Sequence, residues 1–307
     1  MTDPTVAVVG AGRMGGAMVA TLRRAGFPVR VWNRTSAGAH DVAERTGADA
    51  MATPSEAATG ADIVISSLAD DAAVLETYGG TEGVVAGLHR GQVVLEMSTI
   101  APRTVRRVGG LVEERGATLL DAPVSGSVGA AEKGELTVMV GGDRAALDRA
   151  RPVLDALAAK VFHVGALGAG ATVKLAVNAL VHAIDVGLSE ALVLAEKAGV
   201  DRCAAYDVFA AGAAAAPFVL YKRPAFEHPD DTPVAFSLDL MAKDLDLIMA
   251  LAGEVGARMD QSAQNRRTVG HALAAGFAGH DMSAVAAFLR GSGSAGSAAA
   301  AESRSDR

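Results

Sequence analysis

Two residues that could carry acid–base chemistry, Lys174 and Asn178, stand four positions apart in a segment with helical periodicity. Residues at this spacing lie on the same face of a helix, one turn apart. Apolar residues surround the pair, so the lysine either extends its ammonium group to solvent or lies in a cleft that favours its neutral form. A lysine in such a cleft could exchange a proton with a substrate near neutral pH. The pair by itself favours the solvent-exposed alternative.

A second polar group, Ser125, Gly126 and Ser127, follows a strand-like run. In open α/β sheets, ligands bind at the carboxyl ends of the strands. Backbone N–H groups of this segment and its two hydroxyls could replace water around a small carboxylate. A plain turn between two strands would have a similar composition, so this segment alone leaves both interpretations open.

A glycine-rich loop follows the first strand-like run and opens a helical stretch; it consists of Gly10, Ala11, Gly12, Arg13, Met14 and Gly15. In such a loop the first glycine permits a tight turn, the second lets the backbone approach a pyrophosphate, and the third allows close helix–strand packing. The helix N-terminus attracts the phosphate charge. The strand, glycines and helix in this order predict a dinucleotide site. Arg13 could touch the phosphates or point to water.

The end of the second predicted strand carries Asn33, Arg34 and Thr35. NAD-binding proteins usually place Asp or Glu here, against the adenosine ribose. That carboxylate would repel a ribose 2′-phosphate and is absent, whereas the Arg34 guanidinium could bind a phosphate bidentately. The sequence therefore predicts NADP as cofactor. NAD stays open as an alternative, in which Arg34 is solvated and Asn33 hydrogen-bonds the ribose.

The elements that must position these residues alternate in the first half of the chain. Short β-branched runs separated by amphipathic stretches predict strands over 5–9, 29–33, 63–67, 93–97, 118–123, 137–141 and 161–163. Runs this apolar indicate a parallel sheet with helices on both faces. The expected fold class is therefore α/β, with a Rossmann-type doubly wound parallel sheet in an NADP-binding domain over 1–165.

Beyond this domain the sequence predicts helices only. A long interdomain helix is expected over 171–198, followed by helices over 202–213, 239–254, 259–275 and 283–289. Pro217, Pro224, Pro229 and Pro233 are expected in the loops between them. An all-helical C-terminal domain for substrate binding and dimerisation then covers 166–290. The small and polar tail 291–307 is predicted to be disordered.

Composition limits the class of protein. Half of the 307 residues are apolar, and a formal net charge of −7 argues against binding nucleic acid. The single cysteine, Cys203, cannot form an internal disulfide, which suits a reducing compartment. We see no signal-peptide pattern, and charges interrupt the apolar stretches, so a cytoplasmic protein without a membrane partner is expected. The histidines lack ligand spacing, so no metal is expected.

Together, five ordered segments resemble the β-hydroxyacid dehydrogenase family, which includes 3-hydroxyisobutyrate dehydrogenase, tartronate semialdehyde reductase and glyoxylate/succinic semialdehyde reductase. They are VAVVGAGRMGGAM, STIAP, DAPVSGS, GAGATVKLAVN and FSLDLMAKDL, and they cover nearly the whole chain. The resemblance implies that Lys174 transfers a proton, that Asn178 orients the substrate, and that Ser125 with Gly126 holds the substrate carboxylate.

The resemblance also implies that Thr99 and Lys243 contact cofactor or substrate, and that Leu68 and Ala69 lie beside the dinucleotide. The implied reaction is hydride transfer between nicotinamide and a small 3-hydroxy acid or the matching semialdehyde. Many relatives have glycine at the position of Ser127, whereas a serine there occurs in the glyoxylate and succinic semialdehyde reductase branch, so the substrate stays open. Asp70 and Asp71, which follow Ala69, are expected to be solvated loop residues.

Two alternative functions are compatible with parts of the sequence. Imine reductases share this architecture but generally lack a lysine at the position of Lys174. A catalytically silent oligomerisation or chromatin-associated module is disfavoured by the presence of Lys174 and Asn178 and by the acidic charge. Apolar residues around much of the long helix predict a homodimer or homotetramer.

Overall fold

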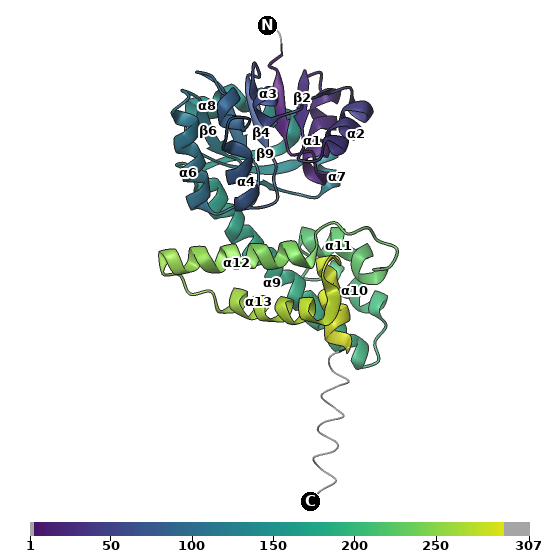
Figure 1. Cartoon of the computed structure of the whole chain (residues 1–307). Helices are drawn as coiled ribbons and strands as arrows, with labels where there is room; N and C mark the ends of the chain where they lie inside the picture. Colours follow the sequence, from purple (N-terminus) through teal and green to yellow (C-terminus); the bar gives the residue numbers. More distant parts are fainter. Residues whose placement is uncertain (1–2, 292–307) are drawn as a thin grey trace, which may run out of the picture. The chain divides into compact units, whose positions relative to one another are not determined.

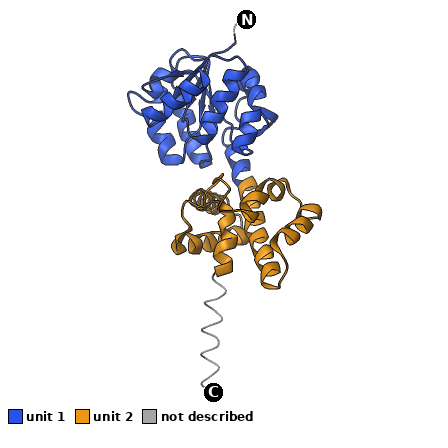
Figure 2. Ribbon diagram, turned by 90° about the vertical axis from the view of Figure 1, so that its right-hand side faces the viewer, with its two compact units in different colours: residues 1–175 blue, residues 176–307 orange. Residues whose placement is uncertain are grey.

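The protein is described here by a computed structural model that covers residues 3–291. The chain divides into two compact units, residues 1–175 and 176–307 (Figure 2). The division falls inside helix α9 (Ala169–Lys197). The boundary expected from the sequence, between 165 and 166, lies just before this helix and stays a prediction. Of the predicted tail, Gly291 is helical, and residues 292–307 lie outside the described part.

The described part of the first unit contains a nine-stranded sheet. Its strands are β1 (Val6–Val9), β2 (Val29–Trp32), β3 (Asp49–Ala50), β4 (Ile63–Ser66), β5 (Val93–Glu96), β6 (Thr118–Asp121), β7 (Val124–Ser125), β8 (Leu136–Gly141) and β9 (Ala158–Gly165). The strands β3-β2-β1-β4-β5-β6 are parallel in this order. The order reverses beside β1, where doubly wound sheets bind their ligands at the carboxyl edge.

Helices cover both faces of the sheet (Figure 1). They are α1 (Arg13–Arg24), α2 (Ser36–Thr46), α3 (Pro54–Ala58), α4 (Asp71–Tyr78), α5 (Val84–Gly87), α6 (Pro102–Glu113), α7 (Val128–Lys133) and α8 (Arg144–Leu157). Successive strand residues point to opposite faces. Val6 and Val8 accordingly belong to one buried cluster with residues of α1 and α8, whereas Ala7 and Val9 belong to another with residues of α3 and α6. The predicted Rossmann-type sheet, buried on both faces, is confirmed.

The antiparallel part of the sheet was not predicted. The strands β6 and β7 both pair antiparallel with β8, and β9 then runs parallel to β8. The strands β3 and β7 have only two residues each, too few for an alternating pattern to be visible in the sequence. The periodicity of the sequence therefore could not predict β3 and β7.

The second unit is helical in its described part. After α9 come α10 (Arg202–Ala211), α11 (Pro217–Glu227), α12 (Leu238–Val255) and α13 (Asp260–Ala272), and a final helix ends at Gly291. The assignment of Pro217 and Pro224 to loops is wrong, because both lie in α11. Pro217 occupies the first turn, where no N–H bond is lost, and Pro224 lies inside the helix.

Helix α9 is the one described helix that is long and apolar enough to span a membrane, with a mean hydropathy of 1.5 in its most apolar stretch. Half of that stretch is buried inside the molecule. The core helix of a soluble protein has the same properties, so α9 is weak evidence for a membrane span.

Candidate cofactor and catalytic site

The glycine loop between β1 and α1 has the geometry of an anion site. A Cβ on Gly10 would lie 2.3 Å from the Ser67 carbonyl oxygen, and one on Gly15 would lie 1.9 Å from the Gly10 carbonyl oxygen. A Cβ on Gly12, in contrast, would meet no described atom within 4 Å. Gly12 is the N-cap of α1, and no described side chain caps this helix end. The first and third glycines therefore serve packing, and the second leaves room at the helix N-terminus for a phosphate.

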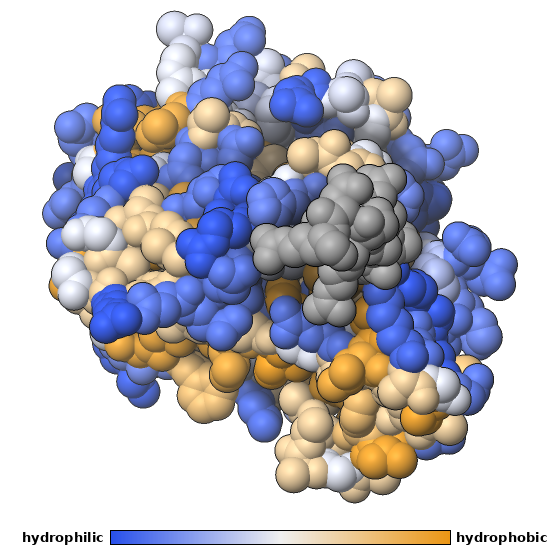
Figure 3. Space-filling model, turned by 90° about the horizontal axis from the view of Figure 1, so that it is seen from below, coloured by the Kyte–Doolittle hydropathy of each residue, from blue (hydrophilic) through white to orange (hydrophobic). Residues whose placement is uncertain are grey.

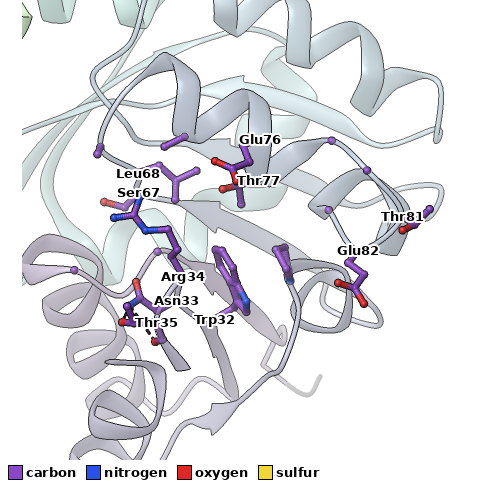
Figure 4. A pocket seen from close by; sticks show the side chains of 18 residues that line it. Trp32, Asn33, Arg34, Thr35, Ser67, Leu68, Glu76, Thr77, Thr81 and Glu82 are labelled. Atoms are coloured by element: carbon purple, nitrogen blue, oxygen red, sulfur yellow. Dashed lines mark hydrogen bonds between the residues drawn. The ribbon is translucent and has the colours of Figure 1, made fainter. Parts of the chain in front are cut away.

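A cavity of about 620 Å³ opens at this loop (Figure 4). It is lined by Gly10, Gly12, Trp32, Asn33, Arg34, Thr35, Pro54, Ser67, Leu68, Ala69, Ala73, Glu76, Thr77, Gly79, Gly80, Thr81, Glu82 and Gly83. The volume suits a small ligand or part of a dinucleotide. Seven of the residues predicted for the cofactor site therefore surround one cavity.

Four other predicted residues of the glycine loop, Ala11, Arg13, Met14 and Gly15, do not line this cavity. Arg13 and Ala11 instead line a second cavity of about 390 Å³ between α1 and α2. Thr99, which follows β5, lines neither cavity. Their proposed contacts with a cofactor stay predictions.

Asn33 holds the glycine loop to the end of β2. Its Oδ1 accepts a hydrogen bond from the Ala11 N–H at 3.1 Å, and its Nδ2 donates to Thr35 Oγ1 at 2.9 Å. The Asn33 side chain has room for these bonds because residue 38 is glycine, since a Cβ there would lie 2.6 Å from Asn33 Nδ2. Figure 4 shows that the neighbouring Arg34 side chain reaches across the cavity toward the loop of Ser67 and Leu68.

A buried hydrogen-bond network adjoins the cavity, and no local pattern in the sequence predicts it. Glu96, the last residue of β5, accepts from Ser66 Oγ at 2.6 Å and from the Ser98 N–H at 2.8 Å. Ser66 Oγ also bonds Tyr78 OH at 2.7 Å, and Ser98 Oγ accepts from the Leu68 N–H at 2.8 Å. Burial raises the pKa of Glu96 and, together with the charge of Glu96, raises that of Tyr78.

The expectation that Asp70 and Asp71 are only solvated is wrong. Asp70 caps α4, because its Oδ1 accepts from the Ala73 N–H at 2.8 Å. Asp71 Oδ1 accepts from the Ala101 N–H at 3.1 Å, which ties the loop after β5 to α4. Helix capping is visible in a sequence, and Asp70 directly before a helical run was such a signal.

Asp121, at the end of β6, holds the start of α9. Its Oδ1 accepts from the Gly168 N–H at 2.8 Å and its Oδ2 from the Ala171 N–H at 2.7 Å. Burial raises the pKa of this carboxyl. Lys174 follows Ala171 by about one helical turn. The candidate proton-transfer residue is thus carried by a helix whose first turn is fixed to the sheet.

The segment predicted to hold a carboxylate leads from the sheet into α7. Ser125 pairs with Thr137 in the β7–β8 ladder. Gly126 has a φ of +142°, a backbone conformation that strongly favours glycine. Ser127 caps α7, since its Oγ accepts from the Ala130 N–H at 3.2 Å. This bond uses a lone pair of the hydroxyl and leaves its O–H group to donate elsewhere.

In the helical unit, Asp244 of α12 brings Asn178 and Lys243 together. Asn178 Nδ2 donates to Asp244 Oδ2 at 2.5 Å, and Lys243 Nζ lies 3.1 Å from Asp244 Oδ1. His182 Nε2 lies 3.8 Å from Asp244 Oδ2. Asn178, His182 and Asp244 are all buried. Asp244 was not among the predicted site residues, although it is adjacent to Lys243 in the FSLDLMAKDL segment.

Among residues 3–291, no group of three or more His, Cys, Asp or Glu side chains is arranged to hold a metal ion.

Two family models match the chain in succession. Residues 5–165 match the NAD binding domain of 6-phosphogluconate dehydrogenase, and residues 168–289 match the NAD-binding domain of NADP-dependent 3-hydroxyisobutyrate dehydrogenase. The 3-hydroxyisobutyrate dehydrogenase of Pseudomonas aeruginosa is 35% identical, over 95% of this chain and 99% of that protein. Glyoxylate/succinic semialdehyde reductase 1 of Arabidopsis thaliana is 32% identical, over 91% of this chain and 96% of that protein.

Solved structures are similar over almost the whole chain. The 3-hydroxyisobutyrate dehydrogenase of Mycobacterium tuberculosis with L-serine has a TM-score of 0.82 at 33% identity, over 94% of this chain and 100% of that chain. The enzyme of Salmonella typhimurium has a TM-score of 0.85 at 28% identity, over 93% of this chain and 100% of that chain. An imine reductase from Pseudomonas sp., 22% identical with a TM-score of 0.63, shares the fold alone.

Proposed function

Because the chain belongs to the β-hydroxyacid dehydrogenase family and is an NAD(P)-dependent hydroxyacid dehydrogenase, we propose that it transfers a hydride between NADP and a small 3-hydroxy acid or the matching semialdehyde. The observation that carries the proposal is the cavity in which the open glycine Gly12, Arg34 and Leu68 meet. The dinucleotide cofactor thus has a candidate binding site.

The preference for NADP rests on the residues after β2. Asn33 holds the glycine loop through a neutral amide, so this position carries no negative charge that would repel a ribose 2′-phosphate. Arg34 lines the cavity and supplies the guanidinium that a ribose 2′-phosphate would require. The acidic residues that line the cavity, Glu76 and Glu82, belong to α4 and the loop after it rather than to the end of β2.

The protein's part in the reaction is positioning and proton transfer. When bound, the nicotinamide supplies or accepts the hydride. Lys174 takes the hydroxyl proton of the substrate in oxidation and returns it in reduction. Ser125, Gly126 and Ser127 bind the substrate carboxylate through N–H and O–H donors. Asn178, oriented by its bond to Asp244, holds the substrate beside Lys174.

We also propose a cytoplasmic homodimer or homotetramer. Apolar side chains of the helical unit remain exposed, among them Leu180 and Leu194 of α9 and Val208 of α10. Figure 3 shows apolar surface on the lower side of the molecule as drawn in Figure 1. Apolar surface of this kind is commonly covered by a second subunit.

The test is oxidation of NADPH and of NADH by the purified protein with glyoxylate, succinic semialdehyde, methylmalonate semialdehyde and tartronate semialdehyde. We expect turnover with NADPH and at least one of these acids. Lys174→Ala should lower kcat by about a hundredfold or more, the usual contribution of a general acid–base. Lys197→Ala, at the end of the same helix, is the matched control and should keep kcat. Full activity of Lys174→Ala would refute its role.

A further inference from the structure

Two buried carboxyl groups lie side by side at the carboxyl edge of the sheet. Glu96 ends β5, Asp121 ends β6, and the two are Cα partners in the parallel ladder. Both residues have an exposed fraction of 0%. Burying a carboxyl group is unfavourable unless hydrogen bonds compensate for lost hydration. Apolar residues fill most of the remaining positions in these strands. The burial of two carboxyl groups among them therefore needs a physical reason.

Glu96 is linked to two walls of the 620 Å³ cavity. Through Ser98 it reaches the backbone of Leu68, a lining residue, by hydrogen bonds of 2.8 Å and 2.8 Å. Through Ser66 it reaches Tyr78 at the end of α4, directly before the lining segment that begins with Gly79. The carboxylate is the one acceptor on which both paths converge.

Asp121 is linked to a different part of the molecule. Its two oxygens accept the Gly168 and Ala171 N–H groups, which lie at the start of α9. The fit is tight, because a Cβ on Gly170 would lie 2.4 Å from the Met139 carbonyl oxygen and 3.0 Å from Asp121 Oδ2. Neither of these two hydrogen bonds leads to a residue that lines the cavity.

We propose that Glu96 and Asp121 are two positioning residues with separate tasks, in which Glu96 fixes the walls of the cofactor cavity and Asp121 fixes the start of the helix that carries Lys174. The second task rests on the proposed function, because it assumes that Lys174 acts in catalysis. If both carboxyls served only the stability of the core, removing either one would lower the melting temperature and leave the Kd for the cofactor and the kcat of the folded protein unchanged.

Glu96→Gln tests the first task. The amide has about the same size but keeps only one of the two oxygens that separately accept from Ser66 and Ser98. We expect the Kd for NADPH to rise by about tenfold, the effect of losing one hydrogen bond to a charged group. Trp32, the single tryptophan of the chain, lines the cavity, so its fluorescence reports binding without any turnover.

Gln92→Leu is the matched control for Glu96. Gln92 is also buried and hydrogen-bonded, with its Nε2 donating to the Ala58 and Ala61 carbonyls, but it lies before β5, at the opposite edge of the sheet. Gln92→Leu should lower the melting temperature and leave the Kd for NADPH unchanged. If Glu96→Gln folds poorly, Ser98→Ala removes only the link to Leu68 and should also raise the Kd.

Asp121→Asn tests the second task. Its amide can accept only one of the two N–H groups, so the start of α9 loosens. We expect kcat to fall by about a hundredfold, as for a small displacement of a reacting group, with the Kd for NADPH unchanged. Amide hydrogen exchange over 168–174 should accelerate in this variant and not in Glu96→Gln. Asp143→Asn is the control, since Asp143 caps α8 through the Ala146 N–H at 2.7 Å.

The proposal is overturned if Gln92→Leu weakens cofactor binding as much as Glu96→Gln does, or if Asp121→Asn weakens it without faster exchange over 168–174. These binding and exchange measurements do not depend on the identity of the substrate. Failure of the proposed function would give a different set of results. Lys174→Ala would then keep its activity, while Glu96→Gln would still raise the Kd and Asp121→Asn would still accelerate exchange.

Discussion

Neighbouring side chains at the end of β2 have different tasks. Asn33 is bound on both sides, to the Ala11 N–H and to Thr35 Oγ1, and therefore fixes the loop. Arg34 is exposed and lines the cavity. A planar guanidinium matches the geometry of phosphate oxygens, whereas a ribose hydroxyl offers it no charge. We therefore predict that Arg34 sets the choice of cofactor.

Arg34→Ala should raise the Kd for NADPH by about ten- to a hundredfold, the value of charge-assisted hydrogen bonds, and leave the Kd for NADH unchanged. Titrations followed by Trp32 fluorescence measure both constants. Arg144→Ala, an exposed arginine of α8 outside the cavity, serves as control. An equal loss of affinity for both cofactors would contradict the assignment of Arg34 to the 2′-phosphate.

A second residue-scale prediction concerns the buried ion pair of Lys222 and Asp281. Lys222 Nζ lies 2.6 Å from Asp281 Oδ1, and both residues are buried. Removing one partner leaves the other charge buried, so Lys222→Met should lower the free energy of unfolding by about 3–5 kcal/mol. Urea denaturation at neutral pH measures the change, and an effect within experimental error would contradict it.

The same pair gives a pH dependence. Burial alone would raise the pKa of Asp281, but the hydrogen bonds and charge of Lys222 lower it below its ordinary value of 3.8. A lowered carboxyl pKa stabilises the folded state above the unfolded pKa, and this stabilisation is lost as the pH falls through the folded pKa. Without Lys222, burial raises the pKa of Asp281, so the deficit of Lys222→Met relative to the natural chain should shrink as the pH falls through 3.8, in denaturation series at decreasing pH.

At the scale of elements, the start of α1 separates packing from binding. Gly15 allows α1 to lie against the turn at Gly10, and Gly12 faces open space. A helix N-terminus without a side-chain cap has unsatisfied N–H groups that a phosphate can satisfy. Two glycines in one motif are therefore needed for different physical reasons.

Alanine substitutions should separate the two reasons. Gly15→Ala overpacks the helix–strand contact and should lower the free energy of unfolding by about 1–3 kcal/mol or more. Gly12→Ala should leave stability nearly unchanged and weaken the binding of NADPH, because the methyl group occupies the space of the phosphate. Thermal unfolding and Trp32 titrations test both variants, and strong destabilisation by Gly12→Ala would argue against an open site.

At the scale of the whole molecule, the exposed apolar side chains of the helical unit are the feature that a single chain leaves unexplained. Leu194 is 73% exposed and Val208 is 67% exposed, while the core of the same unit is formed by residues such as Leu192, Tyr206 and Phe226. Covering such side chains with a second subunit would remove their apolar area from water.

Sedimentation at micromolar concentration should therefore give the mass of a dimer or tetramer. Leu194→Lys places a charge on the apolar surface and should shift the protein toward the monomer, without changing cofactor binding by the first unit. Lys197→Ala, on the last turn of the same helix, is again the matched control. A monomeric mass of the unmodified protein at this concentration would refute the proposed assembly.

Local pattern was enough to predict much of this protein. The glycine loop, the apolar strands and the long helix are encoded in residues near one another in sequence, because turn conformation and side-chain periodicity are local properties. The same holds for the family, whose motifs are short segments. Pro224 inside α11 and the two-residue strands β3 and β7 were missed, because tertiary packing overrides or replaces the local signal there.

Only the tertiary structure decided which side chains act on one another. Asp244 meets Asn178 across 66 positions, Ser66 meets Glu96 across 30, and Asp121 meets Ala171 across 50. Such partners are chosen by the order of strands and the packing of helices, which bring distant residues together at one edge or face. Hydrogen bonds to a buried carboxyl require contact in space, and no periodicity along the chain records that contact.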